Sequence, residues 1–197
     1  MNTAALIAPS PSSRRDGERA IPALVVAFAS DPIIRWLLPT SGAYLTGFTQ
    51  VLHLVADVAT TGGAIDSTGH DAAAAIWHGP GVEVDDEALG GVLAAAIDPA
   101  RHEDAFTFLG RMEECHPTEP HWYLPFVGVD PHHQGRGHGS TLLEQGLARA
   151  DADGLPAYLE ASSPRNRRLY ERHGFEAFAE VQVSDSPPMW PMLRPAA

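Results

Sequence analysis

The stretch Asp130-Pro131-His132-His133-Gln134-Gly135-Arg136-Gly137-His138-Gly139-Ser140-Thr141 decides how the second half of this chain folds. An apolar run, residues 124–129, precedes it, and an amphipathic run, residues 142–150, follows it. This order predicts a strand, a glycine-rich turn and a helix. The first backbone N–H groups of a helix lack partners within it, the helix dipole attracts anions there, and glycines let a ligand approach the backbone. The stretch therefore predicts a turn that holds the pyrophosphate of a nucleotide-type cofactor.

Length and composition indicate one soluble globular domain. The chain has 197 residues, of which 44% are hydrophobic and 19% charged. We expect no membrane span, because no apolar run reaches the roughly 18 residues that a span requires, and residues 1–20 lack the pattern of a secretory signal. The single cysteine, Cys115, is expected to be a small buried residue and cannot form an internal disulfide, which fits a cytoplasmic protein.

The charge of the chain bears on its partners. The formal net charge is −12, and all thirteen basic residues are arginine. This balance argues against a nucleic-acid partner, because a phosphate backbone needs a basic protein face. It is compatible with a cationic acceptor such as an amine.

Hydrophobic periodicity predicts the elements of the first half. We expect residues 1–17 to form a flexible tail, with a short strand at residues 4–8 as its one candidate element. Helices are predicted over residues 18–28, 43–58, 85–97 and 104–115, and strands over residues 64–67 and 72–77. In two of these helices Leu45 and Phe106 are among the residues expected to be buried. The apolar segment 33–38 lies between helix-breaking residues. It could equally line a pocket or pack in the core.

The second half is expected to alternate strands and helices. A strand begins at His121, and the helix after the glycine turn runs to Asp151. A strand over residues 157–160, a helix over 164–173 and strand-like runs at 177–183 and 189–193 follow.

Three kinds of phosphate-binding turn compete for the glycine-rich stretch. A Walker-type loop needs a lysine after its last glycine, and the chain has none. A dinucleotide-binding turn is supported by Gly135, Gly137 and Glu160, which ends the next strand. Against it, Ser140 occupies the third glycine position, and about 120 residues without strand–helix alternation precede the motif. The third kind is an acyl-coenzyme A turn.

Two motifs carry a resemblance to a known family. The pattern Gln134-x-x-Gly137-x-Gly139 resembles the Q/R-x-x-G-x-G/A signature of the GNAT superfamily of N-acetyltransferases. About thirty residues later, Asn166-x-x-x-Tyr170-Glu171-x-x-Gly174-Phe175 resembles the second signature of that superfamily. Within it, residues 119–193 look like the puromycin N-acetyltransferases and their bacterial relatives, whereas the first half matches more loosely.

This resemblance implies a fold and a division of the chain. The implied fold class is α/β (α+β): a GNAT fold, whose mixed, mostly antiparallel central sheet is flanked by helices and splayed between the two strands that hold the acyl-CoA. Residues 18–197 would form a single acetyltransferase domain. Within it, residues 18–118 would form the acceptor side and residues 119–197 the acetyl-CoA-binding core.

The resemblance also implies acetyl-CoA as co-substrate and direct transfer to an amine, without a metal. The backbone of the turn would hold the pyrophosphate, Arg136 would add charge, and the strand before the turn would pair with the pantetheine arm. The residues implied in cofactor binding are Phe126, Val127, Gly128, Val129, Gln134, Gly135, Arg136, Gly137, His138, Gly139, Ser140, Asn166 and Tyr170.

Catalysis needs a proton donor for the leaving thiolate and a base for the amine. Tyr170 lies four residues after Asn166 on one helix face and suits the donor role, because a phenol stays protonated at neutral pH. Glu160 is the implied base, with His121, Glu119 or a water molecule as alternatives. Burial would raise the pKa of Glu160 toward a useful value.

The acceptor pocket is less determined. Trp36, His121, Trp122 and Tyr123 are the candidate substrate-binding residues. The predicted acceptor is a small-molecule amine, with a protein N-terminus or lysine as one alternative. Another alternative is a non-catalytic acyl-CoA-binding module. Dimers are common in this superfamily, so a homodimer is compatible with the resemblance.

Overall fold

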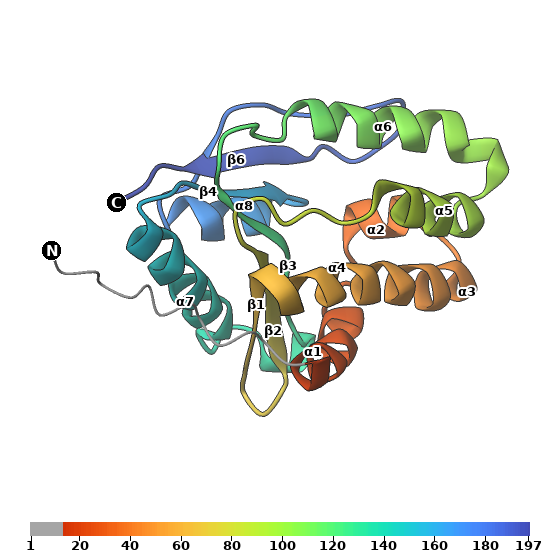
Figure 1. Cartoon of the computed structure of the whole chain (residues 1–197). Coiled ribbons are helices and arrows are strands. Elements are labelled where there is room, and N and C mark those ends of the chain that lie inside the picture. Colours follow the sequence, from red (N-terminus) through yellow and green to blue (C-terminus); the bar gives the residue numbers. More distant parts are fainter. Residues whose placement is uncertain (1–13) are drawn as a thin grey trace, which may run out of the picture.

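The computed structural model describes residues 14–197 (Figure 1). The predicted strand at residues 4–8 and most of the predicted tail lie outside these residues. Helix α1 spans Arg14–Ala27 and so begins four residues before the predicted start at Glu18. Gly17 is buried in α1, and a Cβ atom there would lie 3.4 Å from Ala56. Residues 14–17 therefore pack against the next long helix and belong to the folded domain rather than to a tail.

The first half is mostly helical and contains one hairpin. Within residues 14–197 its elements are α1, α2 (Pro32–Leu37), α3 (Ser41–Ala43), the π-helix η1 (Tyr44–Phe48), α4 (Thr49–Gly62), β1 (Gly63–Thr68), β2 (Ala73–His78), α5 (Asp86–Ala96), the 3-10 turn η2 (Pro99–Arg101) and α6 (His102–Glu114). The segment 33–38, between breakers in the sequence, is the short helix α2. Asp31 caps it, and Pro32 occupies its first turn.

Two predictions of buried residues in this half were wrong. Leu45 is 56% exposed, and Tyr44 occupies the inward position and stacks on Phe48 at 5.4 Å. The chain winds as a π-helix there, and its wider turn changes which residues face the core. Phe106 is 38% exposed, whereas Phe108 is buried against Trp36 with ring centroids 5.5 Å apart.

The second half supplies the other strands and two helices. Its elements are β3 (Trp122–Val129), the 3-10 turn η3 (Pro131–His133), α7 (His138–Asp153), β4 (Ala157–Ala161), α8 (Pro164–Glu171), β5 (Glu176–Ala177) and β6 (Trp190–Arg194). The predicted strand over 177–183 is reduced to β5 and one bridge between Val181 and Met189. The chain turns at Ser184, where φ is 52°, and the Ser186 hydroxyl accepts from the Val183 amide. This turn draws Val181 and Val183 into the core instead of along a ladder.

One six-stranded sheet joins the two halves, in the order β1-β2-β3-β4-β6-β5. Every neighbouring pair is antiparallel except β3 and β4. This parallel pair is joined only at Trp122–Ala157 and Tyr123–Tyr158, so the two strands separate beyond Tyr123. A register shift opposite Ile76 and His78 marks a bulge in β3 next to Pro125. The mixed, splayed sheet confirms the predicted fold class.

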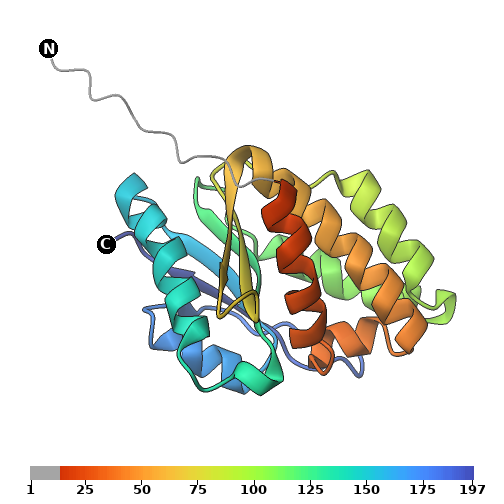
Figure 2. The same ribbon diagram turned by 90° about the horizontal axis from the view of Figure 1, so that it is seen from below.

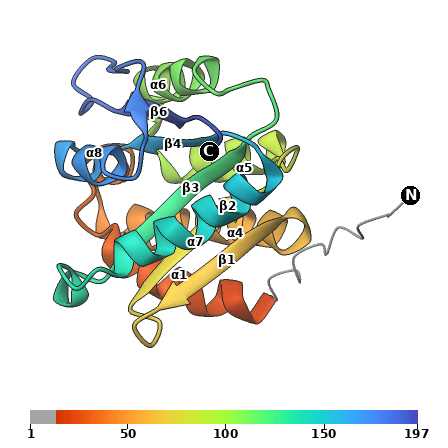
Figure 3. The same cartoon turned by 90° about the vertical axis from the view of Figure 1, so that its left-hand side faces the viewer.

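Helices cover both faces of the sheet (Figures 2 and 3). On one face α7 packs on β1, β2 and β3 over a core that includes Trp77, Leu143 and Tyr170. On the other face α1 and α4 cover the same strands over a core that includes Leu24 and Phe48. Within residues 14–197, no helix combines the length and hydrophobicity needed to cross a membrane.

Two glycines set how closely the helices approach the sheet. A Cβ atom at Gly146 of α7 would lie 2.0 Å from the Trp77 ring. One at Gly128 of β3 would lie 2.6 Å from the Cβ atom of Ala27 in α1. Gly128, which the family resemblance implies in cofactor binding, therefore has a packing role in the fold.

Candidate active site

A groove of about 740 Å³ opens beside the splayed strands. It is bounded by the α1–α2 turn, the end of β3, the glycine-rich turn and α8. Eleven of the residues predicted to bind the cofactor line it: Val127, Gly128, Val129, Gln134, Gly135, Gly137, His138, Gly139, Ser140, Asn166 and Tyr170. The structure thus brings together two motifs that lie about thirty residues apart in the sequence.

Two of the predicted cofactor residues do not line the groove. The Phe126 ring packs against Phe28 and Phe48, with centroids 5.5 Å from each. Arg136 is exposed on the turn. The Phe126 side chain therefore belongs to the core, and only its backbone can face a ligand in the groove.

Three arginines other than Arg136 bring positive charge to the groove. Arg165, Arg168 and Arg172 line the groove from α8 and its C-terminal end. Their spacing, three and four residues apart, places them on one helix face, and this was the signal available in the sequence. A cationic wall on a chain of net charge −12 suits an anionic ligand.

The start of α7 leaves backbone donors available to a ligand. Gly137 is the N-cap with φ of 88°, and no side chain caps this helix. Gly135 also has a left-handed φ, of 76°, and at both glycines a Cβ atom would have no neighbour within 4 Å. Free amides, a helix N-terminus and open space above the glycines fit a pyrophosphate. Beyond Tyr123, β3 has no ladder partner on the β4 side within the described residues, which fits an extended amide-bearing arm.

Tyr170 reaches the groove from α8 and is only 6% exposed. Burial raises the pKa of its hydroxyl above the ordinary value, and the charges of Asp31 and Glu160 raise it further. The phenol therefore remains protonated and can donate a hydrogen.

Glu160 approaches from the opposite face of the sheet. Its neighbours in β4, Leu159 and Ala161, belong to the core under α7, so strand alternation turns Glu160 to the other side. Burial raises the pKa of the Glu160 carboxyl to about 7, although the Tyr123 hydroxyl donates to Oε2 at 3.0 Å and opposes the shift. Tyr158 lies close enough to oppose it as well, but its buried hydroxyl makes no hydrogen bond of good geometry. A carboxyl with a pKa near 7 suits a general base.

Two histidines pack against the tyrosine rings next to this carboxyl. His121 Nδ1 lies 2.7 Å from the Glu119 carbonyl oxygen, and His121 Nε2 lies 3.1 Å from His116 Nε2. Burial, together with the neighbouring His121 and His78, lowers the pKa of His116 to about 4. The His116 ring packs edge-on against Tyr123 and Tyr158, with both centroid distances 4.8 Å. The sequence did not identify His116, because only the fold brings the end of α6 against β3 and β4.

The two tryptophans of the predicted acceptor pocket lie elsewhere. Trp36 is 8% exposed, donates to Asp185 at 2.8 Å and packs on Phe108. Trp122 lies in the core under α7 and donates to Asp153 at 2.8 Å. Of the four candidates, Tyr123 donates to Glu160, and His121 packs against Tyr158 with ring centroids 5.9 Å apart.

A buried carboxyl that the sequence did not single out lies in the groove wall. Asp31 is 8% exposed, and burial raises its pKa despite hydrogen bonds from Ser162 and from the Ile33 and Ile34 amides. The signal in the sequence was the Asp-Pro pair, which is typical of a helix start. Asn166 does not cap α8; Ser163 does, and its hydroxyl accepts from the Asn166 amide.

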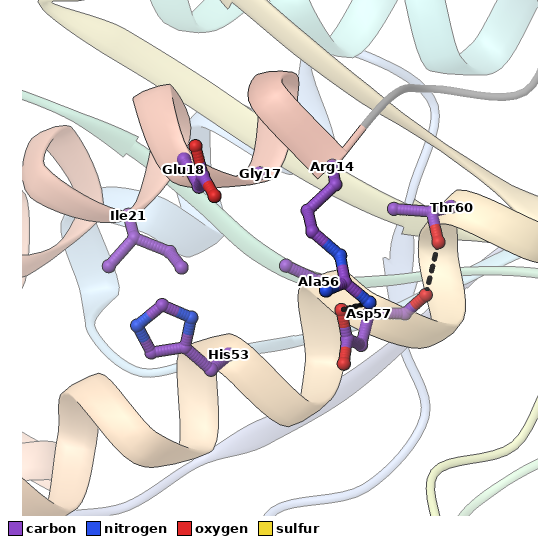
Figure 4. Close-up of a pocket in the computed structure, with 8 residues that line it drawn as sticks. All are labelled: Arg14, Gly17, Glu18, Ile21, His53, Ala56, Asp57 and Thr60. Carbon is purple, nitrogen blue, oxygen red and sulfur yellow. Dashed lines mark hydrogen bonds and ion pairs between the residues drawn. The ribbon is translucent and has the colours of Figure 1, made fainter.

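A second, shallower depression lies between α1 and α4 (Figure 4). It measures about 210 Å³, and Arg14 lies 3.9 Å from Asp57 across it. His53 and Ile21 line its other end. Cys115, at the end of α6, is half-buried, and burial raises the pKa of its thiol. Within residues 14–197, no three His, Cys, Asp or Glu side chains are grouped to hold a metal ion.

Comparison with known proteins agrees with this geometry. The model of the acetyltransferase (GNAT) family matches residues 53–175, more than half of the chain. An uncharacterized N-acetyltransferase of Schizosaccharomyces pombe is 29% identical over 175 residues, 82% of this chain and 71% of the relative. A mycothiol acetyltransferase of Thermomonospora curvata is 41% identical over 78 residues, but these cover 38% of this chain and 26% of that protein.

Among solved structures, the chain is similar to one described as histone acetyltransferase HPA2 and related acetyltransferase from Corynebacterium glutamicum. The TM-score is 0.68 and the identity 28%, and the match covers 95% of this chain and 94% of the other. Members of this family are acyltransferases that use acetyl-CoA as co-substrate. The chain belongs to the GNAT family of acetyltransferases.

Proposed function

We propose that this protein transfers the acetyl group of acetyl-CoA to a primary amine of a small molecule. The observation that carries the proposal is the proximity of two buried groups, the Glu160 carboxyl and the Tyr170 hydroxyl, near the splayed strands. They belong to opposite faces of the sheet, yet the charge of Glu160 contributes to the raised pKa of Tyr170. This arrangement supports a base and an acid that act from the two sides of the thioester.

The groove fits coenzyme A in three parts. The free amides at the start of α7 would hold the pyrophosphate, and the arginines of α8 would add charge. The bare edge of β3 would pair with the amide-bearing arm. When bound there, acetyl-CoA supplies a thioester whose carbonyl carbon is open to attack by an amine.

Each residue has one task in the transfer. The acceptor reacts as the neutral amine, and Glu160, with its pKa of about 7, takes a proton from the nitrogen as it bonds to the carbonyl carbon. As the carbon–sulfur bond breaks, Tyr170 donates its hydrogen to the sulfur. The sum is an N-acetylated amine and free coenzyme A thiol, and the proton on Glu160 replaces the one that Tyr170 gives, by way of solvent.

The acceptor is proposed from the resemblance of residues 119–193 to the puromycin N-acetyltransferases. We infer an aminonucleoside or another antibiotic-like amine. Two rings, from β3 and β4, lie beside Glu160: the Tyr123 hydroxyl donates to Glu160, and the Tyr123 and Tyr158 centroids lie 5.6 Å apart. An aromatic wall beside a carboxyl suits a small amine with a flat, apolar body.

A protein amine is the second candidate. It is favoured by the solved relative from Corynebacterium glutamicum, whose description names a histone acetyltransferase. A basic protein tail would also suit the net charge of −12.

A thiol-release assay with acetyl-CoA tests both candidates. The acceptor panel contains puromycin, other aminonucleosides, arylalkylamines, basic peptides with a free N-terminus and peptides with an internal lysine. We expect turnover with small amines and little with peptides. Turnover with peptides alone would replace the proposal with the second candidate. Thiol release with none, from protein that binds acetyl-CoA, would favour a non-catalytic binding module.

A further inference from the structure

A short chain of hydrogen bonds runs through the wall of the groove. Asp31 Oδ1 accepts from the backbone amides of Ile33 and Ile34, each at 3.0 Å. Asp31 Oδ2 accepts from the Ser162 hydroxyl at 2.5 Å. Ser162 Oγ in turn accepts from Asn166 Nδ2 at 3.4 Å. Asp31 and Ser162 are each 8% exposed, and Asn166 lines the groove.

The chemistry of these groups gives the chain a direction. An ionised carboxylate only accepts hydrogen bonds, so the single hydroxyl hydrogen of Ser162 points to Asp31. The oxygen of Ser162 then offers lone pairs to its other neighbour. Asn166 must therefore turn its NH₂ group to Ser162, which leaves its carbonyl oxygen Oδ1 on the opposite side of the amide.

We propose that Asp31 is a positioning residue that holds the Asn166 amide with Oδ1 toward the groove, as an acceptor for an N–H group of the coenzyme A arm. The inference rests on the proposed function, because it takes the groove to hold that arm. An arm that carries two amides offers N–H donors, and a wrongly turned Asn166 would set NH₂ against N–H. Asp31 thus acts on the ligand through two other side chains.

Asp31→Asn tests the direction with little change of shape. Asparagine caps a helix as well as aspartate does, so α2 keeps its start. Its NH₂ group would replace Oδ2 and donate to Ser162. The hydroxyl would then donate to Asn166, whose amide would have to turn its NH₂ group to the groove. We expect coenzyme A, measured by calorimetry, to bind about tenfold more weakly.

A side-chain exchange makes the test specific. Asn166→Asp alone would set a carboxylate against the lone pairs of Ser162 and weaken binding by a similar factor. In the Asp31→Asn/Asn166→Asp double variant, the hydroxyl of Ser162 can donate to the carboxylate introduced on α8, whose second oxygen again accepts in the groove. We expect the double variant to bind coenzyme A within about threefold of wild type, so that the two losses cancel rather than add.

Two further variants guard against a merely structural effect. Ser162→Ala cuts the chain without touching α2, and in that background Asp31→Asn should cause no further loss of affinity. Asp85→Asn is the matched control, because Asp85 caps α5 by accepting from the Ala88 amide at 2.9 Å, away from the groove. It should leave coenzyme A affinity unchanged.

The outcomes separate the inference from the proposed function. Unchanged affinity in Asp31→Asn, or losses that add in the double variant, would overturn the role of Asp31 while wild type still binds coenzyme A. Absence of coenzyme A binding by wild type would instead overturn the proposed function. Should Asp31→Asn fail to fold, the comparison of Ser162→Ala, Asn166→Asp and their double variant decides. The penalty of Asn166→Asp should shrink once the opposing Ser162 oxygen is gone, and an undiminished penalty would contradict the proposal.

Discussion

At the scale of single residues, the site depends on side chains whose protons are held by burial. Tyr170 keeps its proton because a phenolate would be desolvated and would face the charges of Asp31 and Glu160. The Glu160 carboxyl has a pKa raised to about 7, and desolvation is again the largest cause. The proposed acid thus keeps its proton, and the proposed base loses its proton near neutral pH.

Tyr170→Phe should lower kcat by a factor on the order of 100 or more, because the thiolate would leave without a positioned donor. Affinity for coenzyme A should stay within about twofold, since the ring still fills its place beside Phe175. Steady-state rates and calorimetry measure the two effects. The control is Tyr44→Phe, which removes a buried hydroxyl that donates to the Val25 carbonyl and not to the groove. An unchanged kcat in Tyr170→Phe would remove Tyr170 from the mechanism.

Glu160 predicts the acidic limb of the pH profile. A general base acts when deprotonated, so kcat/KM should rise with pH and level off above about 7, the pKa that burial gives this carboxyl. Glu160→Gln should lose about 100-fold in rate and lose that limb with it. Glu176→Gln, on the exposed residue of β5, should retain the wild-type profile. A limb near pH 7 that persists in Glu160→Gln would assign it to another group.

At the scale of elements, the contact between α7 and the sheet depends on the absence of one side chain. A Cβ atom at Gly146 would lie 2.0 Å from the Trp77 ring, which is itself fully buried. Gly146→Ala should therefore destabilise the fold by about 1–3 kcal/mol through overpacking. Urea unfolding measures the loss.

Gly110→Ala in α6 is the matched comparison. It is also a helix glycine, but a Cβ atom there would meet nothing within 4 Å. Since alanine is the better helix former, we expect a gain of about 0.5–1 kcal/mol. Equal effects of the two substitutions would contradict the packing that brings α7 onto β2.

The elements also show what the sequence could and could not predict. Periodicity and the two motifs located β3, α7, β4 and α8 and half of the groove lining, because those signals are local. The sequence did not single out Asp31 and His116 as site residues, since their contacts at the site are with residues distant in the chain. The burial of Tyr44 instead of Leu45 depends on a π-helix, which helical periodicity does not predict. Trp36 and Trp122 show that an aromatic residue near a motif can serve the core.

At the scale of the whole molecule, the buried Glu160 carboxyl, our proposed base, lowers the stability of the fold. Glu160 has a pKa of about 7 in the folded protein against a usual value of 4.5. Between these values the folded protein holds a proton that the unfolded chain has released, so the free energy of unfolding falls as pH rises through this window. Above pH 7 the cost is constant and amounts to at most about 3 kcal/mol.

Glu160→Gln should therefore be more stable than wild type at pH 8, by up to about 3 kcal/mol, and nearly equal to it at pH 4. Urea unfolding at both values measures the difference. A gap between the two proteins that does not change with pH would mean that the carboxyl is not shifted in the folded state.

The separation of β3 from β4 has a consequence for the behaviour of the protein in storage. Beyond Tyr123, within the described residues, β3 presents backbone groups to no strand on that side. Such an edge is a template for another copy of the chain, and Pro125 removes one of its donors. A bound arm would cover the edge, so coenzyme A should slow aggregation measured by light scattering well below the unfolding temperature. If scattering rose equally fast with and without coenzyme A, the edge would not be where association begins. If coenzyme A slows the scattering, the co-substrate also protects the protein from self-association.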